Sequence, residues 1–254
     1  MKMHFLSGGR LRMRRSVYYP GAAREETLEL PVMCTLLKHS QGNVLFDTGC
    51  SPEAAVDAEA RWGGIARAMV PIYKPEDTVV NQLGKTGLAA DDIDVVICSH
   101  FHPDHCGCNE HFKRATIICH ADELAAAQSE GGVAQGYLPQ EWDHAQRGFD
   151  TFEGQRDLFG DGRIVLLPVP GHTPGMTAAL VALDESGEFL LASDAVAVEA
   201  NLVEGYAPKN SWDMDKANAA IAELRAISER GAKLIYGHDE AQWQALRKGA
   251  EHYA

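Results

Sequence analysis

The chain has 254 residues and a mass of 27.6 kDa, enough length to bury a substantial core. It carries 23 Lys and Arg against 36 Asp and Glu, and this formal net charge of −13 argues against nucleic acid as a partner. Hydrophobic residues make up 45% and charged residues 23%, a globular composition that excludes a fibrous or disordered chain.

The distribution of apolar residues and cysteines indicates the cellular compartment of the protein. No window approaches the roughly 18 to 20 apolar residues that a membrane span needs, so we expect no membrane partner. The opening segment, MKMHFLSGGRLRMRRSVYY, lacks the apolar centre of a secretory signal. The six cysteines are scattered, which suits reduced thiols. These features predict a cytoplasmic protein, and the absence of a linker or repeat predicts a single domain over residues 1–254.

Short β-rich runs dominate the chain. The segment Ser40-Gln41-Gly42 separates two such runs and predicts a hairpin, and Asp184-Glu185-Ser186-Gly187 predicts a second one. In chain order, the strands are expected at residues 32–38, 44–46, 95–98, 116–119, 164–168, 177–183, 189–192 and 233–236.

Helical stretches lie between the strands. The clearest spans residues 213–230, with Asp213 as its cap and Gly231 after its end. Its apolar face carries Met214, Ala217, Ile221, Leu224 and Ile227. A second helix is expected at residues 77–88. Strands interleaved with helices indicate a layered α/β architecture.

The sharpest motif is Ser99-His100-Phe101-His102-Pro103-Asp104-His105, which follows the apolar run at residues 95–98. It places four metal-capable side chains within six residues. A buried strand that ends in such a loop presents its ligands at the carboxyl edge of the sheet. A solvated polar loop is the alternative, and three His with one Asp at this spacing argue against it.

The pattern recurs at other strand ends. Residues 164–168 lead to His172, residues 189–192 lead to Asp194, and residues 233–236 lead to His238. Singly, each side chain is more often an ordinary core or loop residue. Together with the first loop they make five His and two Asp, a set that suits two metal ions with an open position for water.

These motifs resemble the metallo-β-lactamase superfamily over almost the whole chain. The resemblance implies an α/β fold of four layers, αβ/βα, with mixed sheets and helices on the outer faces. It implies two zinc ions, with manganese, cobalt or iron as alternatives. The implied ligands are His100, His102 and His172 for one ion and Asp104, His105 and His238 for the other, with Asp194 bridging both. Asp47, in Leu45-Phe46-Asp47-Thr48-Gly49, is implied to support the ligands by hydrogen bonding.

Within the superfamily, the chain is most similar in sequence to the N-acyl homoserine lactonases, the quorum-quenching enzymes. This similarity lies in residues 99–107, 170–175, 193–195 and 237–239. This implies a hydrolase that opens a lactone ring by attack of a metal-bridging hydroxide. Asp104 is implied as the catalytic group that carries a proton to the departing alkoxide. A homodimer is consistent with the resemblance.

The chain departs from that family at one position. A tyrosine is typical three residues after the bridging Asp, and Ala197 stands there. Tyr206, Tyr137 and Tyr73 are candidates to supply a phenol to the substrate from elsewhere. Met69, in the apolar stretch at residues 54–73, is a further candidate for the substrate pocket.

Two other functions stay open at this point. One is hydrolysis of another lactone or of a thioester, as in glyoxalase II. The other is a metal-binding protein without catalysis, for which Ala197 is the only support. The net charge of −13 favours a neutral small-molecule substrate over a phosphodiester.

Overall fold

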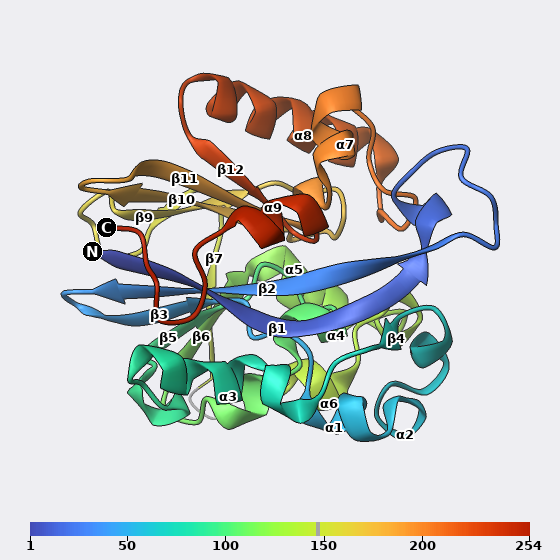
Figure 1. Cartoon of the computed structure of the whole chain (residues 1–254), viewed down its shortest axis with the longest axis horizontal. Helices are drawn as coiled ribbons and strands as arrows, with labels where there is room; N and C mark the ends of the chain where they lie inside the picture. The colour runs from blue at the N-terminus through green and yellow to red at the C-terminus, as the bar shows by residue number, and fades with distance from the viewer. Residues whose placement is uncertain (146–147) are drawn as a thin grey trace.

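The structure, a computed structural model, describes residues 1–145 and 148–254. Its strands form two sheets (Figure 1). The seven-stranded sheet has the order β4-β1-β2-β3-β5-β6-β7, with β1 Lys2–Arg14, β2 Thr27–His39, β3 Gly42–Phe46, β4 Val70–Pro71, β5 Val95–Ile97, β6 Thr116–His120 and β7 Phe149–Phe152. The five-stranded sheet has the order β12-β11-β10-β9-β8, with β8 Arg156–Asp157, β9 Ile164–Pro168, β10 Thr177–Leu183, β11 Gly187–Ser193 and β12 Lys233–Tyr236.

Short helices connect the strands. The α-helices are α1 Pro52–Val56, α2 Ala58–Trp62, α3 Val79–Gln82, α4 Pro103–Cys106, α5 Ala121–Ala127, α6 Pro139–Trp142, α7 Glu199–Glu204, α8 Met214–Glu229 and α9 Glu240–Ala245. The 3-10 helices are η1 Arg15–Val17, η2 Gly63–Arg67, η3 Pro75–Asp77, η4 Leu83–Thr86, η5 Ala90–Asp92, η6 Asn109–His111, η7 Val133–Gln135 and η8 Asp194–Val196. No helix in the described ranges is long and apolar enough to cross a membrane.

The layers follow from the alternation of apolar residues. In β3, Val44 and Phe46 pack into the core between the two sheets, and Leu45 packs into the core under the helices on the opposite face. On the other side of the molecule, α8 buries Ile221 and Leu224 against the outer face of the five-stranded sheet. Figure 1 shows the resulting order of helices, sheet, sheet and helices, which confirms the expected four-layer α/β fold.

Most of the expected elements are confirmed. Strands β9, β10 and β12 have the expected bounds, both hairpins pair antiparallel, and α8 occupies the expected amphipathic stretch. The cysteines in the described ranges are free and buried.

Two expectations differ from the structure. The continuous helix at residues 77–88 is wrong: Thr78 is extended at φ −78° and ψ 154°, and this breaks the segment into η3, α3 and η4. Strand β1 was not expected, because Gly8 and Gly9 lie at an irregularity in its pairing with β2 and interrupt the alternation of apolar residues.

Strand directions bring distant segments together. Strands β9 and β11 both run antiparallel to β10, and β12 runs parallel to β11, so these three end at the same edge of their sheet. In the other sheet, β3 and β5 are parallel. The residues that follow these five strands meet where the two sheets face each other.

Candidate metal centre

Three histidine rings form the first group of this centre. His100 and His102 come from the loop after β5, and His172 comes from the loop after β9. His102 Nδ1 lies 3.1 Å from His100 Nε2 and 3.1 Å from His172 Nε2. These three side chains therefore direct nitrogen atoms at one point.

A second group lies beside the first. Asp104 Oδ2 is 3.5 Å from His105 Nε2 and 3.6 Å from His238 Nε2. Asp104 and His105 lie on the short helix α4, and His238 follows β12 from the other sheet. The two groups contain the same residues that the family resemblance implies for two separate ions.

Asp194 stands between the groups. Its Oδ2 lies 3.4 Å from His172 Nε2 in the first group. Its Oδ1 lies 3.3 Å from His105 Nε2 and 2.9 Å from His238 Nε2 in the second. One carboxylate thus presents a different oxygen to each group, which is the arrangement of a bridging ligand.

The other nitrogen of most of these rings meets an acceptor, which fixes the ring orientation and leaves the inward nitrogen free to bind. The pairs are His100 Nδ1 with Ser99 Oγ at 2.9 Å, His102 Nε2 with Gln135 O at 3.1 Å, His105 Nδ1 with Asp47 Oδ2 at 2.9 Å, and His238 Nδ1 with Pro31 O at 2.9 Å.

Burial and charge set the protonation of the centre. Burial lowers the pKa of His100 well below its usual range and that of His172 to about 3, so both rings are neutral. Burial also opposes charge on His105 and Asp194. The carboxylates of Asp104 and Asp194 outweigh it and raise the pKa of His105, while His238 and His105 lower that of Asp194. His100 and His172 therefore present neutral rings, whereas the raised pKa of His105 favours its protonated ring, which must lose that proton when a metal cation binds.

The donor set fits divalent metal ions. Ligands of one tetrahedral zinc ion, with bonds of about 2.0 to 2.1 Å, lie roughly 3.3 Å apart, close to the separations within each group. In the described chain, His105 Nε2 and Asp194 Oδ1 are buried, and the short contacts they make lack the geometry of a hydrogen bond. Such atoms are costly to bury unless a cation satisfies them.

Asp47 supports the centre from behind. It follows β3 in the left-handed region at φ 59°, uncommon for a residue other than glycine. Its Oδ1 accepts a 2.7 Å hydrogen bond from Ser99 N, and its Oδ2 accepts 2.8 Å and 3.2 Å bonds from Ser99 Oγ and Ser193 Oγ. Ser193, at φ 46°, is a second left-handed residue beside Asp194. Both local conformations serve to aim the segments that carry the ligands.

Glu123 is a supporting residue that sequence reasoning missed. It lies on α5 and is fully buried, with Oε1 accepting from Phe101 N at 2.9 Å and Oε2 accepting from Gly175 N at 3.0 Å. One carboxylate therefore ties the loop after β5 to the loop after β9. The only available signal was its place three residues beyond the end of β6, at the same edge of the sheet.

A cavity of about 510 Å³ opens beside His102. Its walls are largely apolar and include Met13, Val17, Ile65 and Met69, the last from the stretch predicted to line the substrate pocket. A smaller cavity of about 240 Å³ adjoins His102 and His172, and Tyr137 lines it. Met69 and Tyr137 are thus both placed beside the first group of rings.

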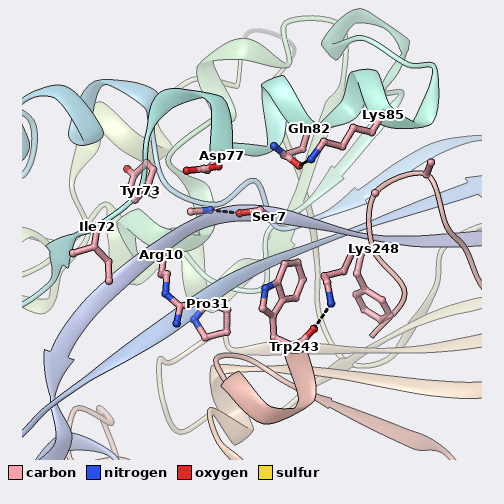
Figure 2. Close-up of a pocket in the computed structure, with 14 residues that line it drawn as sticks. Ser7, Arg10, Pro31, Ile72, Tyr73, Asp77, Gln82, Lys85, Trp243 and Lys248 are labelled. Carbon is pink, nitrogen blue, oxygen red and sulfur yellow. Dashed lines mark hydrogen bonds between the residues drawn. The ribbon is translucent and has the colours of Figure 1, made fainter. Parts of the chain in front are cut away.

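The two other predicted tyrosines lie elsewhere. Tyr73 lines a separate cavity of about 500 Å³ between β1, the segment before α3, and α9, where Figure 2 shows it across from Trp243. The Tyr73 hydroxyl donates to Ser51 O at 2.7 Å. Tyr206 lies in the connection between α7 and α8, where burial and then Glu204 raise its pKa.

The chain is similar to known proteins over its whole length. The profile of the metallo-beta-lactamase superfamily matches residues 27–238. An N-acyl homoserine lactonase from Bacillus sp is 32% identical over 95% of this chain and 94% of that protein. N-acyl homoserine lactonase AttM from Azorhizobium caulinodans is 27% identical over 100% and 98%. A crystal structure of an N-acyl homoserine lactone hydrolase with N-hexanoyl-L-homoserine bound at its catalytic metal centre has a TM-score of 0.87 at 28% identity, covering 99% of this chain and 98% of that one.

Proposed function

The chain belongs to the metallo-beta-lactamase superfamily and is a hydrolase of that superfamily, and we propose that it opens the ring of N-acyl homoserine lactones. The observation that carries the proposal is Asp194, whose two oxygens face two separate groups of ligands beside an apolar cavity. The relatives that share its length are named for this activity.

The residues of the centre would hold two ions. His100, His102 and His172 would hold the first, Asp104, His105 and His238 would hold the second, and Asp194 would serve both. When bound, two divalent ions would supply an activated water and polarise the lactone carbonyl. We further propose zinc for both positions, since nitrogen and carboxylate donors suit it.

The side chains around the ions have distinct tasks. Asp47 and Ser99 hold the rings of His105 and His100 in orientation through their outer nitrogens. Asp104, 4% exposed, keeps a carboxylate at the edge of the centre and carries the proton to the departing oxygen. The Cys106 thiol donates a hydrogen bond to His102 O at 3.2 Å and takes no part in the reaction.

The acyl chain would occupy the cavity of about 510 Å³ beside His102. Met13, Ile65 and Met69 provide apolar contact for its methylene groups. Each methylene removed from water contributes about 0.8 kcal/mol, so this cavity sets the preferred chain length.

Elemental analysis combined with a lactone panel tests the proposal. Acid release is followed by a pH indicator for N-acyl homoserine lactones, simple γ- and δ-lactones and one thioester. We expect about two zinc ions per chain and turnover of the acyl homoserine lactones. His102→Ala should lose one ion and nearly all activity. His252→Ala, outside the centre, should keep two ions and the wild-type activity.

The other outcomes are equally informative. If the protein binds two ions but turns over only the thioester or the simple lactones, the proposed substrate class is wrong and the proposed metal centre stands. Two ions without any turnover would identify a metal-binding protein. A chain without bound metal after exposure to zinc would refute the proposal. The cytoplasmic location and the homodimer stay predictions.

A further inference from the structure

Tyr18 is a buried phenol beside the metal centre that the reaction described above does not use. It follows η1 and is 2% exposed. Its ring lies edge-on to the ring of His238, with centroids 6.5 Å apart and an interplanar angle of 67°. Neither β1 nor η1 contributes a residue to the two groups of ligands. Tyr18 therefore reaches the centre from an independent part of the chain.

The backbone around Tyr18 is held in place from both sides. Tyr18 N donates to Arg15 O at 3.1 Å within its own turn. Asn201 Nδ2, on α7, donates to Tyr18 O at 3.4 Å, and Lys209 N donates to Val17 O at 2.9 Å. This position is fixed by contacts with the segment that follows Asp194, so the phenol keeps its place relative to the bridging ligand.

The phenol has a poor hydrogen-bond partner. Its O–H donates to the Met13 thioether sulfur at 3.3 Å, and a thioether is a weak acceptor. Met13 lines the cavity beside His102. A carbonyl oxygen that enters this space would be a better acceptor than sulfur.

Ala197 and Tyr18 lie in the same part of the core. Both residues belong to one buried cluster that also contains Leu30 and Val198. Ala197 is fully buried, and its carbonyl accepts a 2.7 Å hydrogen bond from His238 N. A larger side chain at this position would have to be accommodated within the same buried cluster. The small residue on one element and the phenol on another are thus parts of one arrangement.

We propose that Tyr18 is a catalytic residue, whose O–H turns from the Met13 sulfur to donate a hydrogen bond to the lactone carbonyl oxygen and strengthens that bond as negative charge develops there. This role rests on the proposed function. Of the other tyrosines considered for it, the Tyr73 hydroxyl is engaged by Ser51 O, and Tyr206 lies in the connection between α7 and α8. Tyr137 lines the smaller cavity beside His102 and His172, at the first group of rings.

The first test replaces the hydroxyl alone. Tyr18→Phe keeps the ring, so we expect normal folding and an unchanged metal content. Loss of one such donor lowers kcat on the order of 10²-fold, and KM should change much less. Tyr19→Phe is the matched control, because Tyr19 is the neighbouring residue and its ring stacks on the Arg15 guanidinium at 4.2 Å. A tyrosine difference absorption band on binding N-hexanoyl-L-homoserine should disappear in Tyr18→Phe and persist in Tyr19→Phe.

A relocated phenol gives the second test. The double variant Tyr18→Ala with Ala197→Tyr supplies the hydroxyl from the residue that follows η8, and it should recover part of the lost kcat. Tyr18→Ala with Ala197→Phe fills the same space without a hydroxyl and should recover none.

The outcomes separate this inference from the proposed function. Wild-type kcat in Tyr18→Phe, with lactone turnover intact, would overturn the role of Tyr18 alone. Loss of bound metal in Tyr18→Phe would also overturn it, since the residue would then be structural. Absence of lactone turnover in the wild-type protein would overturn both.

Discussion

Gly175 lies directly against Glu123. The Gly175 N–H donates to the Glu123 carboxylate at 3.0 Å, and a Cβ on Gly175 would overlap the backbone of Glu123. The same carboxylate receives the Phe101 N–H, so the loops that carry His102 and His172 are held together through α5. The separation of the first three ligands therefore depends on a close backbone approach that only glycine permits.

Gly175→Ala tests this approach. The added methyl group must displace the backbone of α5, and overpacking of this kind costs about 1–3 kcal/mol of the free energy of unfolding. Gly84→Ala is the control, because a Cβ there meets no atom within 4 Å. Urea unfolding measures both variants. Equal stability of Gly175→Ala and the wild-type protein would contradict the close approach.

Glu123 should make stability depend on pH in a definite direction. Burial raises its pKa to about 7 from an unfolded value near 4.5, so the folded chain binds this proton more tightly. Its contribution to the free energy of unfolding is complete below pH about 4.5 and is lost as the pH rises to about 7. The loss is on the order of 3 kcal/mol.

Comparison with Glu123→Gln isolates this effect, because contributions shared by both proteins cancel in the difference. Urea unfolding at pH 4.5, 6 and 8 should show the advantage of the wild-type protein shrinking as the pH rises. A constant difference, or one that grows with pH, would mean that Glu123 stays ionised in the folded chain.

Asp47→Asn should weaken metal binding without unfolding the chain. Asparagine tolerates the left-handed conformation at this position, but its amide is a poorer acceptor for Ser99 N and for His105 Nδ1. Loss of such a supporting carboxylate lowers metal affinity by about 10- to 100-fold. Competition with a chelator measures the change, and Asp91→Asn, an exposed substitution, is the control. An unchanged metal affinity in Asp47→Asn would show that Asp47 does not support the metal-binding side chains.

Met69→Trp should change the preference for acyl chain length. The larger side chain narrows the cavity beside His102, which penalises long chains more than short ones. Loss of contact with two methylene groups, at about 0.8 kcal/mol each, lowers the ratio of kcat/KM for decanoyl over butanoyl substrates by roughly tenfold. Val203→Trp, at a side chain that is 70% exposed, is the control. An equal fall for both substrates would place the acyl chain elsewhere.

The grouping of the expected metal-binding side chains could be predicted from the sequence because each follows a strand with a strong local signal. His172, Asp194 and His238 stand just beyond apolar runs of β-branched and aliphatic residues, and that pattern survives in the fold. Strand β1 carries no such alternation, so it and Tyr18 beyond its end gave no signal. Glu123 reads as an ordinary helical residue, since its role depends on backbone N–H groups of two distant loops.

The two groups of ligands draw on both sheets. His100 to His105 extend from the seven-stranded sheet, while His172, Asp194 and His238 extend from the five-stranded one. Ions bound there would therefore act as a reversible cross-link across the interior of the fold, one that would form only after both halves of the chain have been synthesised. Removing the ions would remove this cross-link as well as the catalytic metal. The metal-free protein should therefore melt at a lower temperature, and adding metal back should restore the original melting temperature.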